Sequence, residues 1–236
     1  MAGTRIPPSP RMRTASTHLL RILHLASPAL PIGAFHFSQG LEYAVEAGWV
    51  TNESSALEWI TGVARHSIGT LDLPVLFRMH RAASNGDPHE LQRWGRFLLA
   101  ARETEELRAE DRHMGSALAR ILRDLGASIP GSNEPRRQPS YAEMFAVACA
   151  YWNISGNEAL QAYAWTWAEN QMLAAVKLVP LGQSAGQRIL HALVPLLEEI
   201  ATQAFDIDDQ DIGACAAMQG LASARHETQY TRLFKS

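Results

Sequence analysis

Residues 155–180 read SGNEALQAYAWTWAENQMLAAVKLVP and predict a long helix. Ser155 and Glu158 form the Ser-x-x-Glu capping box that opens helices, and Pro180 is a residue type that stops them. Between these ends, large and small apolar side chains recur at helical spacing on one side, at Leu160, Tyr163, Trp167, Ala174 and Leu178. This pattern is typical of a helix that packs against a core.

The segments on either side carry similar signals. We expect helices at 16–26, at 38–47, after Asn52, after Asp87-Pro88, at 103–125, after Ser140 and at 184–205, with Pro195 bending the last of these. A final helix is expected to begin at the acidic cluster 206–211 and to end near Ala224. No alternating strand pattern persists beyond four residues. The sequence therefore predicts an all-α fold, a single-domain bundle of about nine or ten helices over 16–224.

Composition excludes several classes of protein. The 236 residues are 47% hydrophobic, which supports a real core, and the formal net charge of -3 does not favour nucleic-acid binding. An all-α DNA-binding regulator would need a basic recognition helix, and no predicted helix carries one without matching acids. No apolar stretch approaches eighteen residues, so we expect no membrane span.

The ends of the chain and its cysteines indicate a cytoplasmic protein. Residues 1–15 carry arginines among prolines and glycines but lack the apolar stretch of a signal peptide, so we expect a disordered basic extension. Cys149 and Cys215 each lie in an Ala-rich helical context, which fits reduced thiols better than a disulfide.

Motifs for chemistry are missing from the sequence. It contains no Gly-rich phosphate loop, no pair of histidines four residues apart, no His-Glu-x-x-His and no Cys-x-x-Cys, so we expect no cofactor or metal site. His24 and His66 lie on or beside apolar stripes, so they are expected to be core residues. The acids of 103–112 are interspersed with arginines at helical spacing, which favours a solvated, self-paired helix face over a catalytic pair.

One enzymatic alternative stays open. Cys149 could be the nucleophile of an all-α small-molecule hydrolase of the thiaminase type. Nothing near it in sequence would lower the pKa of its thiol, so burial in the core is the better interpretation. A closed pocket around Cys149 with a carboxylate in reach would favour the enzyme.

Two internal features suggest contacts with other proteins. The loop 31–42 places Phe35 and Phe37 beside a glycine turn and then begins a helix that carries Glu42. The alternative is a hydrophobic loop that only anchors two helices.

Lys177 interrupts an apolar run at a helix end, and it is the only lysine of the folded body. It is either a charged contact on an apolar surface or a cation that complements the helix dipole.

The C-terminal tail, residues 225–236 (RHETQYTRLFKS), is the third such feature. Most of it is polar, and Tyr230, Leu233 and Phe234 have only weak helical spacing. Ordering twelve residues costs more conformational entropy than burying two apolar side chains returns. The tail is long enough to cross its own body toward the Phe35–Glu42 loop. We therefore expect a tail that needs further contacts from a partner.

Five stretches resemble the UreF family of urease accessory proteins. They are 25–33 (LASPALPIG) continuing to 38–42 (SQGLE), 44–50 (AVEAGWV), 101–108 (ARETEELR), 176–183 (VKLVPLGQ), and 223–236, which includes the tail. The likeness covers nearly the whole chain from residue 19 onward. Ala34 stands where the family usually has a second glycine, and His36 stands where a small residue is common. These departures bear on how flexible the turn at 33–36 is.

The resemblance implies an all-α protein without a reaction of its own. Such proteins form homodimers, bind a UreD-type (UreH) accessory protein, recruit the GTPase UreG and dock on urease apoprotein to insert nickel. It also implies regulation of GTP hydrolysis and a tail that is mobile alone and ordered in the complex. Arg225 and Arg232 could serve as an arginine finger or, as we prefer, pin the tail to carboxylates. The residues expected to contact partners are Phe35, Phe37, Glu42, Lys177, Arg225, His226, Tyr230, Arg232, Leu233 and Phe234.

Overall fold

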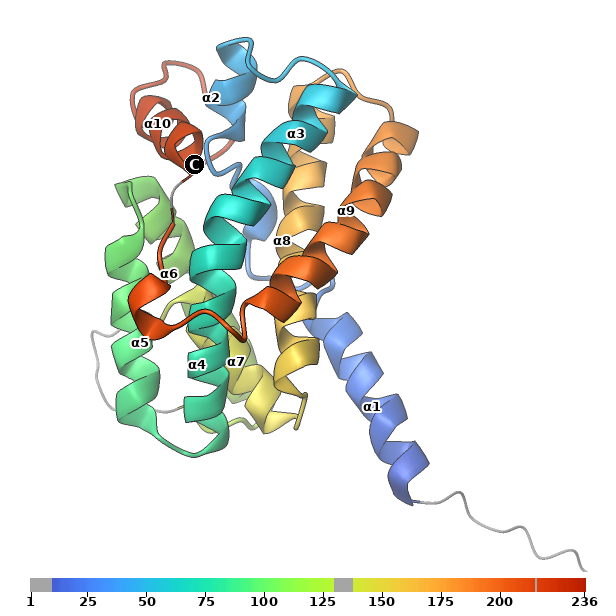
Figure 1. Cartoon of the computed structure of the whole chain (residues 1–236), viewed down its shortest axis with the longest axis vertical. Helices are drawn as coiled ribbons and strands as arrows, with labels where there is room; N and C mark the ends of the chain where they lie inside the picture. Colours follow the sequence, from blue (N-terminus) through green and yellow to red (C-terminus); the bar gives the residue numbers. More distant parts are fainter. Residues whose placement is uncertain (1–9, 130–137, 215) are drawn as a thin grey trace, which may run out of the picture.

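The computed structural model describes residues 10–129, 138–214 and 216–236, and this part of the chain is helical without strands (Figure 1). This confirms the predicted all-α fold. The helices are α1 (Pro10–Leu25), α2 (Leu41–Glu46), α3 (Glu53–Val63), α4 (Leu73–Ser84), α5 (Pro88–Ala101), α6 (Glu105–Asp124), α7 (Tyr141–Tyr151), α8 (Gly156–Leu178), α9 (Gln183–Gln203) and α10 (Ala217–His226).

Helices α7 and α8 form the centre of the bundle. The capping box of α8 is present as predicted, with the N–H of Glu158 donating to the Ser155 hydroxyl. Helix α8 packs against α9, α3, α2, α4 and α7. Every residue of α7 from Tyr141 to Cys149 is buried. Helices surrounded on all sides lack a polar face, which is why their apolar positions are so numerous.

Helices α3 and α4 form one continuous rod with a π-helical segment between them, η2 (Ala64–Asp72) (Figure 1). Pro74 stands at the start of α4, where it restarts regular α-helix. Gly69 lies within η2, and a side chain there would meet Ile200 of α9 at 3.1 Å. The glycine therefore allows α9 to approach the rod closely.

A buried ion network joins this rod to the start of α6. Arg102 contacts Asp72 at 2.6 Å and Asp111 at 3.1 Å, and both aspartates are at most 5% exposed. Asp111 also accepts a hydrogen bond from the N–H of Tyr141. The network fixes α6 against α7, and with it the surface on which the C-terminus lies.

Three sequence predictions were wrong in this region. Within 103–112, Glu105 forms the expected surface pair with Arg108, but Glu110 and Asp111 are buried. Their partners come from elsewhere in the chain, which helical spacing cannot indicate. His24 and His66 are exposed and not in the core. His24 lies beside the ring of Trp152, the residue that follows α7, with 6.0 Å between the ring centroids.

The helix ends also differ from the prediction at both termini. Helix α1 begins at Pro10 and not at residue 16, since proline is favoured in the first turn. Residues 1–9 of the expected extension, and Cys215, lie outside the described part. The acidic cluster holds only a short 3-10 turn, η3 (Asp209–Asp211), because Arg78 binds both Asp209 and the Ile207 carbonyl. Helix α10 starts later and continues to His226.

Candidate functional site: the docked C-terminal tail

The C-terminal tail crosses its own body and ends beside the loop that precedes α2 (Figure 1). Its first two residues complete α10, and the rest is irregular. Gly40, at the start of α2, lies so close to α10 that a side chain there would meet the Ser223 nitrogen at 2.8 Å. Its φ of 84° is the left-handed region that glycine tolerates best. The close packing of α2 and α10 brings the tail to its binding place.

Glu42 of α2 is a hydrogen-bond acceptor for the backbone of the tail. Its carboxylate accepts hydrogen bonds from the backbone N–H groups of Leu233, at 2.6 Å, and Phe234, at 2.8 Å. The side chain is only 8% exposed, so these charge-assisted bonds form away from water. Glu42 therefore binds the tail through its main chain.

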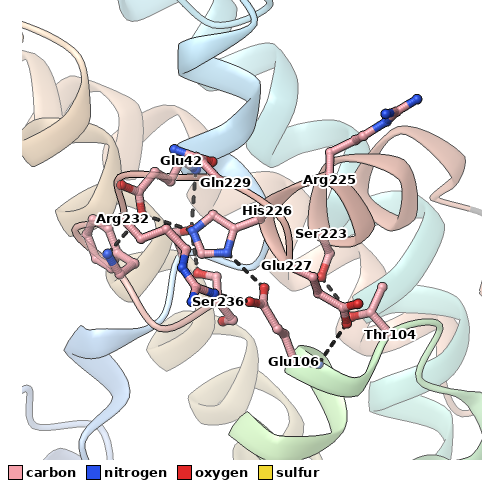
Figure 2. Close-up of polar contacts among 12 residues, drawn as sticks. Glu42, Thr104, Glu106, Ser223, Arg225, His226, Glu227, Gln229, Arg232 and Ser236 are labelled. Carbon is pink, nitrogen blue, oxygen red and sulfur yellow. Dashed lines mark hydrogen bonds and ion pairs between the residues drawn. The ribbon is translucent and has the colours of Figure 1, made fainter.

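His226 lies between two carboxylates (Figure 2). Its Nε2 is 3.0 Å from Oε2 of Glu42, and its Nδ1 is 2.8 Å from Oε2 of Glu106. The histidine is completely buried. An ionised carboxylate only accepts hydrogen bonds, so both ring nitrogens must donate. The histidine ring therefore links α10 to α2 and α6 through one carboxylate on each of its two nitrogens.

Two further contacts hold the tail on the start of α6. Arg232 donates to Oε1 of Glu106 at 2.9 Å. Glu227 accepts from the N–H groups of Glu105 and Glu106, at 3.1 and 3.4 Å. A carboxylate at this end of a helix satisfies free N–H groups and complements the helix dipole. We call the group Glu42, His226, Glu106 and Arg232 the tail clamp.

The last residue of the sequence is fully buried. The N–H and the hydroxyl of Ser38 donate to the Ser236 main-chain oxygen, at 2.6 and 2.5 Å. The Ser236 hydroxyl donates to Oε2 of Glu110 at 3.1 Å, and Nε2 of Gln39 donates to the other oxygen at 2.8 Å. Burial raises the pKa of Glu110 to about 7, although these two hydrogen bonds act in the opposite direction. A group that titrates near neutrality thus lies under the end of the tail.

Phe234 is the apolar anchor of the tail, and Leu233 is not. Phe234 is 6% exposed, whereas Leu233 is 68% exposed. Only the Phe234 side chain of this pair packs into the hydrophobic core. Lys177 lies over the rings of Phe234 and Phe35, with its Nζ 5.5 and 5.9 Å from the ring centroids. These distances are within the range of a cation–π contact.

The structure separates the ten predicted contact residues into two groups. Glu42, His226 and Phe234 are buried where the tail contacts the body. Phe37 is buried against His113, which supports the alternative that its loop anchors helices. The exposed group contains Phe35, Lys177, Arg225, Tyr230, Arg232 and Leu233. Figure 2 shows Arg225 pointing away from the clamp. That the tail is mobile until a partner binds stays a prediction.

Sequence reasoning predicted Glu42 but missed the other residues that receive the tail. Ser38 and Gln39 lie in the quoted loop but were not singled out, and Glu106 and Glu110 were assigned to a solvated face. One signal could have found Glu106 and Glu110. They are four residues apart on α6, so both point to the same side, where arginine partners of α6 itself are lacking.

The enzymatic alternative finds no support. The Cys149 thiol is buried, and burial raises its pKa, which is the opposite of activation. A pocket of about 60 Å³ lies beside Asp72 and Arg102, and Cys149 is not among its lining residues. Among the described residues, no three histidine, cysteine or acidic side chains are placed to hold a metal ion. The same residues include no helix with the length and apolar character of a membrane span.

The fold and the site define an all-α helical bundle that holds the last residues of the chain through buried polar side chains. Comparison with known proteins gives the particular family. A model of the UreF family matches residues 50–194. Urease accessory protein UreF of Hahella chejuensis is 45% identical over 92% of this chain and 98% of its own length. UreF of Alkalilimnicola ehrlichii is 45% identical over 92% of this chain and 95% of its own length. UreF of Teredinibacter turnerae is 43% identical over 94% of this chain and 100% of its own length.

The chain therefore belongs to the UreF family of urease accessory proteins. It is a non-catalytic protein that takes part in urease maturation.

Proposed function

We propose that this chain is a scaffold for the insertion of nickel into urease apoprotein. In this proposal it links a UreD-type (UreH) accessory protein to the GTPase UreG, regulates GTP hydrolysis by contact, and works in the cytoplasm as a homodimer. Without a phosphate loop in its sequence, it can influence a GTPase only through its surface. The observation that supports the proposal most is the docked tail.

The docked tail supports this role because of what it leaves exposed. The clamp occupies backbone groups and His226, so the side chains of Tyr230 and Leu233 remain free for a partner. Tyr230 is fully exposed and Leu233 is 68% exposed. Aromatic side chains such as that of Tyr230 are enriched at the centre of protein–protein interfaces. We infer that the accessory partner binds these side chains.

The two tail arginines have different roles in this proposal. Arg232 is paired with Glu106, which supports our preferred interpretation that it pins the tail. Arg225 is exposed and extends away from the clamp. If the chain contributes an arginine to the GTPase, Arg225 is therefore the better placed of the two.

Mobility of the tail is part of the same proposal. The docked and released tails are in equilibrium, and a partner that binds only the docked form shifts the population toward it. The contacts of the tail clamp lower the free energy of the docked form. Binding of the partner supplies the rest of the free energy that is needed to hold the tail in place.

Deletion of residues 229–236 tests this function. The shortened chain keeps α10, His226 and Glu227, so its helical circular dichroism is expected to stay near that of the full chain. It should no longer co-purify with the UreD-type protein. The variant Tyr230→Ala, which keeps every described tail hydrogen bond, should weaken the same complex. If the shortened chain binds the partner with full affinity, the proposed role of the tail is wrong.

A further inference from the structure

Two of the carboxyl groups that receive the tail lie against basic side chains. Glu42 and Glu106 each contact one ring nitrogen of His226, at 3.0 and 2.8 Å. Glu106 also accepts a hydrogen bond from the Arg232 guanidinium at 2.9 Å. Cations and hydrogen-bond donors beside a carboxyl group favour its ionised form. These two groups are therefore suited to hold the tail as carboxylates.

Glu110 is the third carboxyl group under the tail, and its partners are different. One oxygen accepts a hydrogen bond from the Ser236 hydroxyl at 3.1 Å, and the other accepts one from the Gln39 amide at 2.8 Å. The indole N–H of Trp167 donates to the side-chain oxygen of Gln39 at 2.9 Å and so fixes the amide in place. Glu110 is 6% exposed. The group is therefore buried between two neutral donors, without a cation from the tail among its described contacts.

The charged groups around Glu110 do not compensate for its burial. Burial is the largest influence and raises the pKa of Glu110 to about 7, while the two hydrogen bonds and the charge of Arg102 act in the opposite direction. Arg102 is already paired with Asp72 and Asp111, and the charge of Asp111 adds to the effect of burial. The other titratable side chains around the same pocket are Glu103, Tyr141 and Tyr163.

Release of the tail changes the surroundings of Glu110. Ser236 is completely buried against it, so its departure lets water reach the carboxyl group. Ionisation in water does not carry the cost of burying a charge. The docked tail therefore favours neutral Glu110, whose hydroxyl can donate to Ser236 while its other oxygen accepts from Gln39. The released tail favours the ionised group.

We propose that Glu110 takes up a proton when the tail docks, which makes the hold of the tail clamp sensitive to pH. The inference goes beyond the proposed function, because it concerns the chain alone. The contribution of neutral Glu110 to docking is fully present below the ordinary pKa of 4.5 and is lost as the pH rises through 7. Between pH 6 and pH 8 the equilibrium constant for docking should fall about tenfold.

Amide hydrogen exchange in the free, full-length chain tests this coupling. The N–H groups of Leu233 and Phe234 donate to Glu42 only when the tail is docked, so their protection measures the docking equilibrium. Exchange is measured at pH 6 and pH 8 and corrected for the intrinsic rate at each pH. Protection in the natural chain should fall about tenfold between these values. Glu110→Gln keeps both contacts without titrating and should lose most of this fall.

A matched control separates Glu110 from carboxyl groups in general. Glu169 of α8 also has a pKa raised by burial, so Glu169→Gln should show the same fall in protection as the natural chain. Protection that is absent or equal at both pH values in the natural chain would overturn the inference. An undiminished fall in Glu110→Gln would also overturn it, because the proton would then belong to another group such as His226. So would a fall that is lost equally in Glu169→Gln. Because no partner protein takes part, these results leave the proposed function standing.

Discussion

Replacing His226 by alanine is expected to release the C-terminal tail from the body. The change removes the ring that bridges Glu42 and Glu106 and leaves both carboxylates, at most 12% exposed, without this partner. Removing one partner of a charged group held away from water typically costs about 3–5 kcal/mol. Most of this cost is expected to fall on docking, because the tail can detach while the bundle remains folded. The docked population should then fall about a hundredfold or more relative to the released one.

Limited digestion with trypsin measures this release. The tail contains cleavage sites after Arg225, Arg232 and Lys235, and a segment must leave its binding place before a protease can cut it. His226→Ala should be cut after Arg232 far faster than the natural chain, with the body left intact. Tyr230→Ala is the control, since this fully exposed side chain contributes nothing to the clamp. Equal cleavage rates in all three proteins would show that the clamp does not hold the tail.

Replacing Glu110 by glutamine is expected to remove a pH dependence of stability. The pKa of Glu110 is raised to about 7 from an ordinary value of 4.5 because the group is buried. Folding therefore favours its neutral form. The stability that this form provides is fully present below about pH 4.5 and is lost as the pH rises through 7. Over this interval the loss is about 3 kcal/mol, at about 1.4 kcal/mol per unit of pKa.

The glutamine variant keeps the geometry without the charge. Its amide can accept from Gln39 and donate to Ser236, so both contacts of Glu110 are retained. Urea unfolding at several pH values should show that the variant gains stability relative to the natural chain as the pH rises from 4.5 to 8. Glu169→Gln on α8 should show a smaller change in the same direction, because Glu169 is only partly buried. A constant difference for Glu110→Gln across this range would contradict the account.

The sequence predicted those features that depend on neighbouring residues. The caps at Asn52, Asp87 and Ser155 are present in the structure, because a cap requires only its own side chain and the next turn. The π-helical segment, which includes Gly69, was not predicted from helical spacing. The acidic cluster was misassigned because Arg78 comes from a helix far away in sequence.

At the tail site, too, the contacts between residues far apart in sequence were not predicted. Its composition indicated that it needs contacts beyond its own apolar residues, and the structure supplies many of them from Glu42, Glu106 and Ser38. Glu106 and Glu110 of this segment contact residues more than one hundred positions away. Helical spacing could place Glu106 and Glu110 on one face, but it could not show that the tail covers that face.

Amide hydrogen exchange over residues 229–236 tests the central claim most directly, that partners bind the docked tail. The N–H groups of Leu233 and Phe234 donate to Glu42 only in this state. Exchange is compared between the free chain and its complex with the UreD-type protein. The account predicts slower exchange at both residues in the complex, because the partner shifts the tail into the clamp. Unchanged or faster exchange in the complex would contradict it.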